Sequence, residues 1–234
     1  TLPSRGDLIV YDELIHASAH DGMRLSKADA AAARHNDPQS FDDAIRAWRT
    51  AGGAGQPWIV VESLYSMDGD RAPIDDLADI ANRHDAMLIV DEAHATGVFG
   101  PDGRGLAAHL EGSANVITLH TCGKALGVMG ALVLAPRTIR DFLVNRARSF
   151  IYATAPSPLV ASAVRAALEL CRKEPHRREE LHRRIAFAET ELKSKTRFAP
   201  SGSQIQPIII GADSSAVALA SAMKARGYDI RAIR

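Results

Sequence analysis

The sequence has little of what marks several common classes of protein. Its two cysteines, Cys122 and Cys171, lie far apart and match no metal-binding spacing, so we expect a reduced, cytoplasmic protein. Its 28 basic and 28 acidic residues balance, so we expect neither nucleic acid nor a membrane as a partner. No apolar run approaches the roughly 20 residues of a spanning helix, and the first residues lack the order of a signal peptide. The 234 residues are enough for one large α/β domain, or one domain plus part of another.

Two nucleotide-binding motifs are also missing. No Gly-x-Gly-x-x-Gly follows a predicted strand, and Ala125 after Lys124 breaks the phosphate-binding loop pattern of nucleoside triphosphatases. An acidic stretch matches no calcium-loop spacing, and helix capping and solvation explain its members: Asp68, Asp70, Asp75 and Asp76. The sequence therefore predicts no metal site.

Short apolar segments alternate with amphipathic ones over the first 150 residues. This pattern predicts an α/β fold with a mostly parallel central sheet and helices on both faces. We expect strands at 7–12, 29–33, 57–63, 86–91, 115–120 and 130–135, and helices at 16–25, 40–51, 74–84 and 137–148. Ser40, with Asp43 three residues later, predicts a helix N-cap, and Pro73 is expected to open the following helix.

The composition changes after Ser149. Residues 157–196 are rich in Ala, Leu, Glu and Arg, which predicts one long bent helix or two helices that part at Pro175. An extended segment near 204–210, a helix at 214–226 and a short strand at 228–233 should follow. We therefore predict a large domain over 1–165 and the start of a smaller α+β domain over 166–234.

A lysine and an aspartate each follow an apolar strand. Lys124 lies between Gly123 and Gly127, and Asp91 ends the run that begins at Met87. An exposed loop lysine and a helix-capping aspartate are the ordinary alternatives. Ligands in open parallel sheets gather at the carboxyl ends of strands, so both residues should meet at one edge. An amine can form a Schiff base, and a carboxylate can keep a heterocyclic nitrogen protonated; pyridoxal 5'-phosphate needs both.

Further polar side chains follow predicted strands or lie near helix ends. His16 follows the first strand, and its imidazole could stack on a planar ring or be an ordinary first-turn histidine. His94 could bond a cofactor hydroxyl or lie in a surface turn, and Ser66 lies in a plausible turn sequence. Thr121 and Thr154 carry hydroxyls that suit phosphate but are common anywhere.

Taken in order, these motifs resemble one family. The chain contains His16-Ala-Ser, Ser66-Met-Asp-Gly-Asp-x-Ala-Pro73, Asp91-Glu-Ala-His-Ala-Thr-Gly97, Gly103-Arg-Gly105, Thr121-Cys-Gly-Lys124, Ser203-x-Ile-Gln-Pro207 and Ala232-Ile-Arg234. Their order and approximate spacing resemble the α-oxoamine synthases, which are fold-type I, pyridoxal-phosphate-dependent acyltransferases. The resemblance extends along nearly the whole chain and is specific as a set, although no single motif is.

The resemblance implies roles for the residues nearest the chemistry. Lys124 would bind the cofactor aldehyde and later remove the Cα proton. Asp91 would pair with the pyridinium nitrogen, and His16 would stack on the ring, so that Lys124 and His16 are the implied catalytic residues.

The resemblance also implies roles in holding the cofactor. Ser66 and His94 would reach the ring hydroxyl, and Thr121 would bind the phosphate. Thr154 would bind it from across the interface of a homodimer. Cys122 stands where many relatives carry an aromatic residue and is expected to be a small apolar filler.

Within the family, the chain most resembles members that join L-alanine to a pimeloyl thioester in biotin synthesis. The carrier of the thioester, coenzyme A or acyl carrier protein, cannot be read from the residues. Sister enzymes that use glycine or serine are the first alternative, and an inactive partner subunit is the second, although Lys124 argues against it. Relatives have a further N-terminal segment and a C-terminal arginine that binds the amino-acid carboxylate. We therefore expect a fragment that does not turn over by itself.

Overall fold

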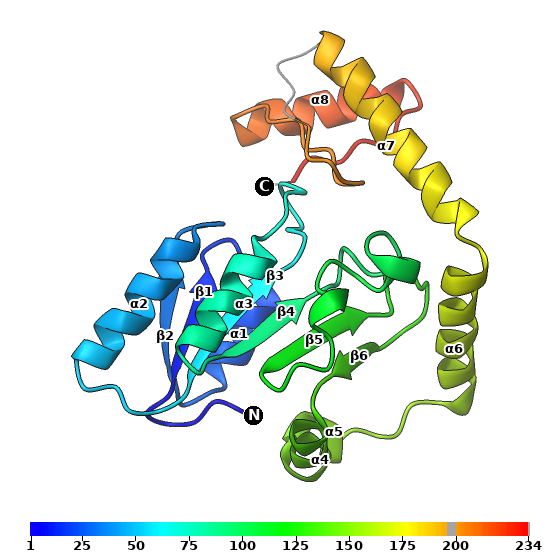
Figure 1. Cartoon of the computed structure of the whole chain (residues 1–234). Helices are drawn as coiled ribbons and strands as arrows, with labels where there is room; N and C mark the ends of the chain where they lie inside the picture. The colour runs from blue at the N-terminus through cyan, green and yellow to red at the C-terminus, as the bar shows by residue number, and fades with distance from the viewer. Residues whose placement is uncertain (196–199, 234) are drawn as a thin grey trace.

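The strands form one sheet in the computed structural model, which describes residues 1–195 and 200–233. Within these residues, six strands lie in the order β2-β1-β3-β4-β5-β6 (Figure 1). They are β1 (Leu8–Asp12), β2 (Asp29–Ala33), β3 (Pro57–Glu62), β4 (Met87–Asp91), β5 (Val116–Thr121) and β6 (Ala131–Leu134). All neighbours pair in parallel except β5 and β6, which are antiparallel. The predicted strands over the first 135 residues and the mostly parallel sheet are confirmed.

Helices follow the strands along the chain. They are α1 (Ala17–Arg24), α2 (Pro38–Thr50), α3 (Ile74–Arg83), α4 (Arg137–Arg146), α5 (Arg148–Ile151), α6 (Pro158–Lys173), α7 (His176–Lys195) and α8 (Asp213–Ala225). Two short 3-10 helices, at Pro101–Gly103 and Ala108–Leu110, were not predicted. For the segment predicted at 157–196, the described residues to 195 form two helices that part at Pro175, one of the two forms expected. Within the described residues, none of the helices is long and apolar enough to cross a membrane.

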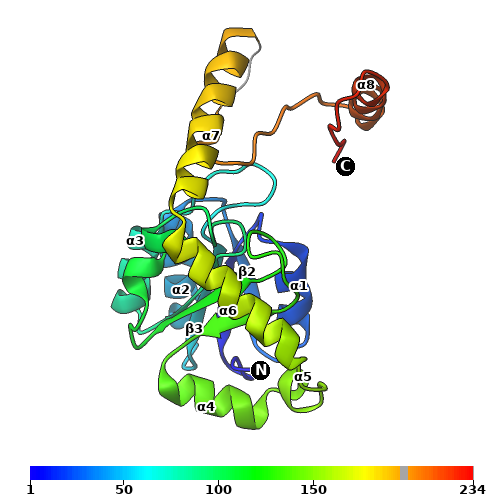
Figure 2. The same ribbon diagram turned by 90° about the vertical axis from the view of Figure 1, so that its right-hand side faces the viewer.

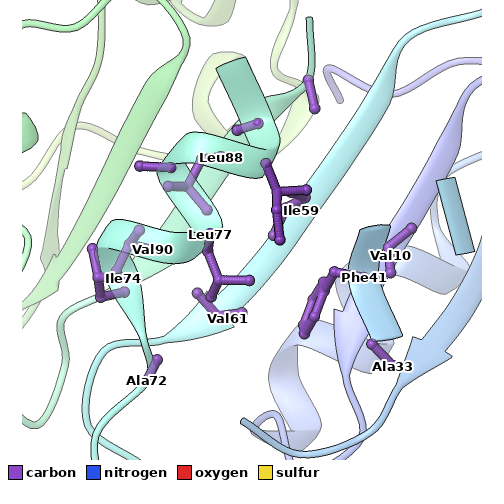
Figure 3. Close-up of a cluster of buried hydrophobic side chains, with 14 of the residues drawn as sticks. Val10, Ala33, Phe41, Ile59, Val61, Ala72, Ile74, Leu77, Leu88 and Val90 are labelled. Carbon is purple, nitrogen blue, oxygen red and sulfur yellow. The ribbon is translucent and has the colours of Figure 1, made fainter. Parts of the chain in front are cut away.

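Apolar side chains are buried on both faces of the sheet. On one face, Ile59 and Val61 pack under Phe41 of α2 and Leu77 of α3 (Figure 3). On the other face, Trp58 and its neighbours pack with Met23 of α1 and Ile139 of α4. Parallel strands buried on both sides are expected to be apolar throughout, which explains runs such as Pro57–Val61. The prediction of helices on both faces is confirmed.

Some local predictions were wrong. Asp37, not Ser40, caps α2, because its carboxylate accepts hydrogen bonds from the N–H groups of Gln39 and Ser40 and Pro38 takes the first helical position. Residues 228–233, which were predicted as a strand, form none, because no neighbouring strand pairs with them within the described structure. Arg234, the last residue of the quoted motif, lies outside the described residues.

The second part of the chain covers the sheet only in part. Figure 1 and Figure 2 together show α6 beside the sheet, past the edge strand β6, with α7 extending beyond the sheet and α8 lying apart from it. Residue 165, at which we predicted a domain boundary, lies inside α6, and the division into two domains stays a prediction. A link to the sheet comes from residues 202–205: the Arg71 guanidinium donates to the carbonyl of Gly202 at 3.1 Å, and Ile205 packs near Leu64.

Candidate active site

The predicted chemical residues gather where the central strands end. Asp91 is the last residue of β4 and pairs in register with Glu62, the last residue of β3, on one side and with Leu119 of β5 on the other. Thr121 ends β5, and His16 caps the helix that follows β1. Because parallel strands all end at the same edge of a sheet, residues far apart in sequence meet there.

Lys124 lies against a histidine from the neighbouring connection. Its Nζ is 2.7 Å from Nε2 of His94, a residue 30 positions earlier in the chain. The loop that carries Lys124 is held by hydrogen bonds from Cys122 N to Gly130 O at 2.9 Å and from Gly127 N to Lys124 O at 3.0 Å. Lys124 is therefore presented from a turn closed by backbone bonds, and its flanking Gly127 adopts the left-handed φ of 64° that the turn requires.

The local electrostatics make the Lys124 ammonium a stronger acid than a lysine in water. Loss of water around the ammonium lowers the pKa of Lys124, although the negative charges of Asp91 and Glu62 act in the opposite direction. Burial, followed by the positive charges of Lys124 and His16, lowers the pKa of His94 to about 4. The His94 imidazole is thus neutral near pH 7, and its Nε2 lies within hydrogen-bond distance of the Lys124 Nζ.

Asp91 is a carboxylate whose charge is only partly compensated. Burial raises its pKa, although the N–H of Ala93, which donates to Oδ1 at 2.8 Å, and the charge of Lys124 lower it. A cationic N–H donor placed beside this carboxylate would offset the cost of its burial.

The remaining predicted residues differ in their hydrogen bonds and in their exposure to solvent. His16 is the N-cap of α1, where its Nδ1 accepts from Ser18 N at 3.2 Å. Ser66 is half-buried in the turn after β3. Thr121 Oγ1 accepts from Gly123 N at 3.4 Å. Thr154 is exposed between α5 and α6, and no described hydrogen bond joins it to the other candidates.

Glu62 belongs to this group and was not predicted. Its side chain is 1% exposed, and Oε1 accepts the backbone N–H of His16 at 2.7 Å. The signal was present in the sequence, because Glu62 ends an apolar strand in the same way as Asp91. Only the register of β3 against β4 shows that the two carboxylates are neighbours.

A cavity adjoins the amine. It has a volume of about 310 Å³, and its lining includes His94, Lys124, Gln204 and Ile205. Gln204 Nε2 donates to the carbonyl of His94 at 2.7 Å, across 110 residues of sequence. The segment after α7 therefore forms one wall of the site.

The residues present fit a pyridoxal group. The carboxylate of Asp91 is half-buried, and the one hydrogen bond described for it comes from a neutral backbone N–H, so it could accept a further bond from a pyridinium N–H. Lys124 offers an amine of lowered pKa at the same edge of the sheet, which suits capture of an aldehyde. Within the described residues, no cluster of His, Cys, Asp and Glu is arranged to hold a metal ion.

Known proteins similar to this chain share its fold and much of its sequence. The 8-amino-7-oxononanoate synthase of Chromobacterium violaceum is 42% identical over 235 residues, which cover 100% of this chain and 60% of that protein. A crystal structure of the 8-amino-7-oxononanoate synthase of Francisella tularensis is 29% identical with a TM-score of 0.81, covering 97% of this chain and 65% of that one. A serine palmitoyltransferase solved with pyridoxal phosphate is 27% identical with a TM-score of 0.76, covering 86% and 51%.

These matches confirm the fold-type I architecture that the motifs implied. The chain spans about three-fifths of the length of the curated relatives that it matches. The family model described as aminotransferase class I and II matches residues 2–234. The chain therefore belongs to the family of class I and II aminotransferases.

Proposed function

We propose that this chain carries the pyridoxal-phosphate site of an acyltransferase that condenses L-alanine with a pimeloyl thioester and releases carbon dioxide. The product would be 8-amino-7-oxononanoate, an intermediate of biotin synthesis. Identity of 42% along the whole chain to a protein of that name supports this choice. The geometry that carries the proposal is the 2.7 Å approach of the Lys124 amine to His94, together with the half-buried carboxylate of Asp91, on which the charge of Lys124 acts.

Pyridoxal phosphate, when bound, supplies an aldehyde that links to amines and a ring that takes up the electron pair left at Cα when a proton is lost. Lys124 would hold the aldehyde until the amino acid displaces it. The freed amine would then accept the Cα proton and later return a proton to the product. The lowered pKa of Lys124 supports this role, because a base must be unprotonated at the operating pH.

Asp91 would keep the ring nitrogen protonated. A carboxylate within hydrogen-bond reach raises the pKa of a cationic partner, and burial at the end of β4 strengthens that interaction. The side chain thus stabilises the charge that develops when Cα loses its proton.

Other side chains would orient the cofactor. His16 would lie against the ring, Ser66 and His94 would reach the ring hydroxyl, and Thr121 would bind the phosphate. Thr154, exposed after α5, would add a phosphate contact from a second copy of the chain in a homodimer. The two free cysteines agree with the reducing, cytoplasmic location that we propose for this homodimer.

Reductive trapping tests the cofactor assignment. The whole protein, loaded with pyridoxal phosphate, is treated with borohydride, digested and mapped by mass spectrometry. We expect the pyridoxyl group on Lys124, and Lys124→Ala should abolish the trapping. Lys27, an exposed lysine between α1 and β2, supplies the matched control, because Lys27→Ala should leave the trapping unchanged. A pyridoxyl group on another lysine would end the assignment.

Product analysis tests the substrates. The full-length protein is given a pimeloyl thioester, as the coenzyme A ester or on acyl carrier protein, with alanine, glycine or serine in parallel. We expect turnover with alanine and the amino-ketone as product. The similarity to a serine palmitoyltransferase makes serine the specific alternative, and preferred turnover with serine or glycine would reassign the enzyme to a sister activity. A protein that binds no cofactor would instead be an inactive partner subunit.

A further inference from the structure

We propose that Glu62 is a positioning residue of the cofactor site, which acts by holding the backbone of His16. The inference rests on the proposed function, in which His16 lies against the cofactor ring. It assigns a role to a buried carboxylate that does not itself need to touch the cofactor.

The hydrogen bond between Glu62 and His16 links the end of β3 to the segment that joins β1 to α1. Glu62 ends β3 and is 1% exposed, and its Oε1 accepts the N–H of His16 at 2.7 Å across 46 residues of sequence. His16 is the N-cap of α1, so this backbone group sets where the helix begins. A carboxylate acceptor makes a shorter and stronger bond than a neutral one. The bond therefore fixes the start of α1 relative to the end of β3.

Strand alternation places Glu62 on the face of the sheet that carries the site. Trp58 and Val60 belong to the apolar cluster on one face, and Glu62 follows them with the same period of two. Met87 and Ile89 lead in the same way to Asp91, which pairs with Glu62 in register. Directly opposite residues of neighbouring strands have side chains close together. His16 is thus held beside the carboxylate proposed to bind the ring nitrogen.

The charges around Glu62 agree with this position. Burial and the negative charge of Asp91 raise the pKa of Glu62 to about 7, although hydrogen bonds from the backbone N–H groups of His16 and Ser66 act in the opposite direction. The positive charge of Lys124 also acts on it. Glu62 is therefore electrostatically part of the group formed by Asp91 and Lys124, and not an isolated buried acid.

Glu92 provides a contrast within the same sheet. It is 0% exposed and follows β4, and its carboxylate accepts the N–H of Leu106 at 3.1 Å and the Ser63 hydroxyl at 2.6 Å. Both glutamates anchor backbone that comes from elsewhere in the chain. Only the backbone anchored by Glu62 carries a residue of the proposed cofactor site.

A double-mutant cycle on cofactor binding tests the inference. Pyridoxal phosphate is titrated into the whole protein and the variants Glu62→Leu, Glu62→Gln, His16→Ala and Glu62→Leu with His16→Ala, followed by the absorbance of the lysine-linked cofactor. We expect Glu62→Leu to weaken binding on the order of tenfold, as loss of a hydrogen bond to a charged group does. Glu62→Gln keeps a carbonyl acceptor and should bind within about threefold of the wild type. Because Glu62 acts through His16, the double variant should bind like His16→Ala alone.

Backbone hydrogen exchange gives a second readout that needs no cofactor. The N–H of His16 should be protected in the wild type and exposed in Glu62→Leu. Val61→Ala is the matched control, because it removes packing on the opposite face of the same strand and should leave both His16 protection and cofactor binding unchanged.

The outcomes separate the two proposals. A wild type that binds pyridoxal phosphate, combined with additive effects of the two substitutions, would overturn the role of Glu62 and leave the proposed function standing. Unchanged protection of the His16 N–H in Glu62→Leu would also overturn the role of Glu62 without affecting the proposed function. A wild type without a lysine-linked absorbance band would overturn the proposed function and this inference with it.

Discussion

Side chains pack much more tightly in residues 1–135 than in the second region, residues 137–195 and 200–233. The first region holds nearly all of the buried side chains, including Ile59, Leu77 and Leu88, each at 1% exposure or less. In the second region α4, α5, α6 and α8 contain no buried residue. Large apolar side chains there stay exposed, such as Leu159 at 78% and Phe187 at 68%.

The difference in packing indicates which region can hold catalytic side chains in fixed positions. A catalytic group must be held to a fraction of an ångström by packed neighbours, and strand ends in a buried sheet meet that requirement better than open helices. Asp91, Glu62 and Lys124 all come from the packed region. Thr154 comes from the open one, and the role proposed for it needs a second copy of the chain. Substitutions in the two regions test whether the first is packed and the second open. The largest expected effect is a loss of several powers of ten in rate, and the smallest is a small change in stability.

Asp91→Asn should have the largest effect. Without a carboxylate to hold the ring nitrogen protonated, loss of the alanine Cα proton should slow by several powers of ten, on the order of 10³ or more, while cofactor binding is largely spared. Exchange of the Cα proton into deuterated water measures this step. Asp213→Asn, at the exposed start of α8, is the matched control and should exchange at the wild-type rate. Near wild-type exchange in Asp91→Asn would remove the role of that residue.

Paired leucine truncations test packing directly. Leu77→Ala empties a fully buried site under α3 and should lower the free energy of unfolding by about 2–5 kcal/mol. Leu159→Ala, in the exposed first turn of α6, should change it by less than about 0.5 kcal/mol. Urea unfolding monitored by circular dichroism gives both values. A similar cost at the two positions would mean that α6 is covered in solution.

Two glycines test how the second region docks on the first. Gly69 has a φ of 70°, and an added Cβ would lie 2.5 Å from the carbonyl oxygen of Ile205. Gly211 has a φ of 100° with nothing within 4 Å of an added Cβ. Gly211→Ala should cost about 1 kcal/mol for its backbone alone, and Gly69→Ala about 1–3 kcal/mol because backbone must also move. Equal costs from urea unfolding would show that the contact with Ile205 contributes nothing.

The smallest effect concerns pH and His35. This imidazole bonds Asp12 through Nδ1 and Asp70 through Nε2, each at 2.8 Å. Burial lowers its pKa, but the hydrogen bonds and charges of the two carboxylates outweigh burial and raise it above the ordinary 6.5. The folded state therefore binds the proton more tightly than the unfolded state. The resulting stability is fully present below pH 6.5 and is lost as the pH rises through the folded pKa.

Replacing His35 by Gln should remove the loss of stability that sets in as the pH rises above the ordinary histidine pKa of 6.5. The free energy of unfolding, measured by urea titration at several pH values, checks it. His176→Gln, whose side chain is 69% exposed, is the matched control and should keep the wild-type profile. An unchanged profile in His35→Gln would mean that another group titrates.

Prediction from sequence worked where one local signal was sufficient. The strands from 7–12 to 130–135 were found because buried parallel strands are apolar runs bounded by polar residues. The cap of α2 was misplaced because Asp37, Pro38 and Ser40 all carry helix-start signals, and only the backbone geometry decides among them. The segment 228–233 was predicted as a strand from its residues, but a strand exists only where a neighbour pairs with it.

The sequence by itself determined the order of the elements, the family and the kinds of chemical group at the site. Apolar runs, turn residues and the motif around Lys124 are local, so they can be read without the fold. The tertiary structure alone decided that Glu62 pairs with Asp91, that Lys124 meets His94, and that Gln204 closes the cavity. Those contacts join residues 29 to 110 positions apart. They depend on strand register and side-chain packing, which no local pattern specifies.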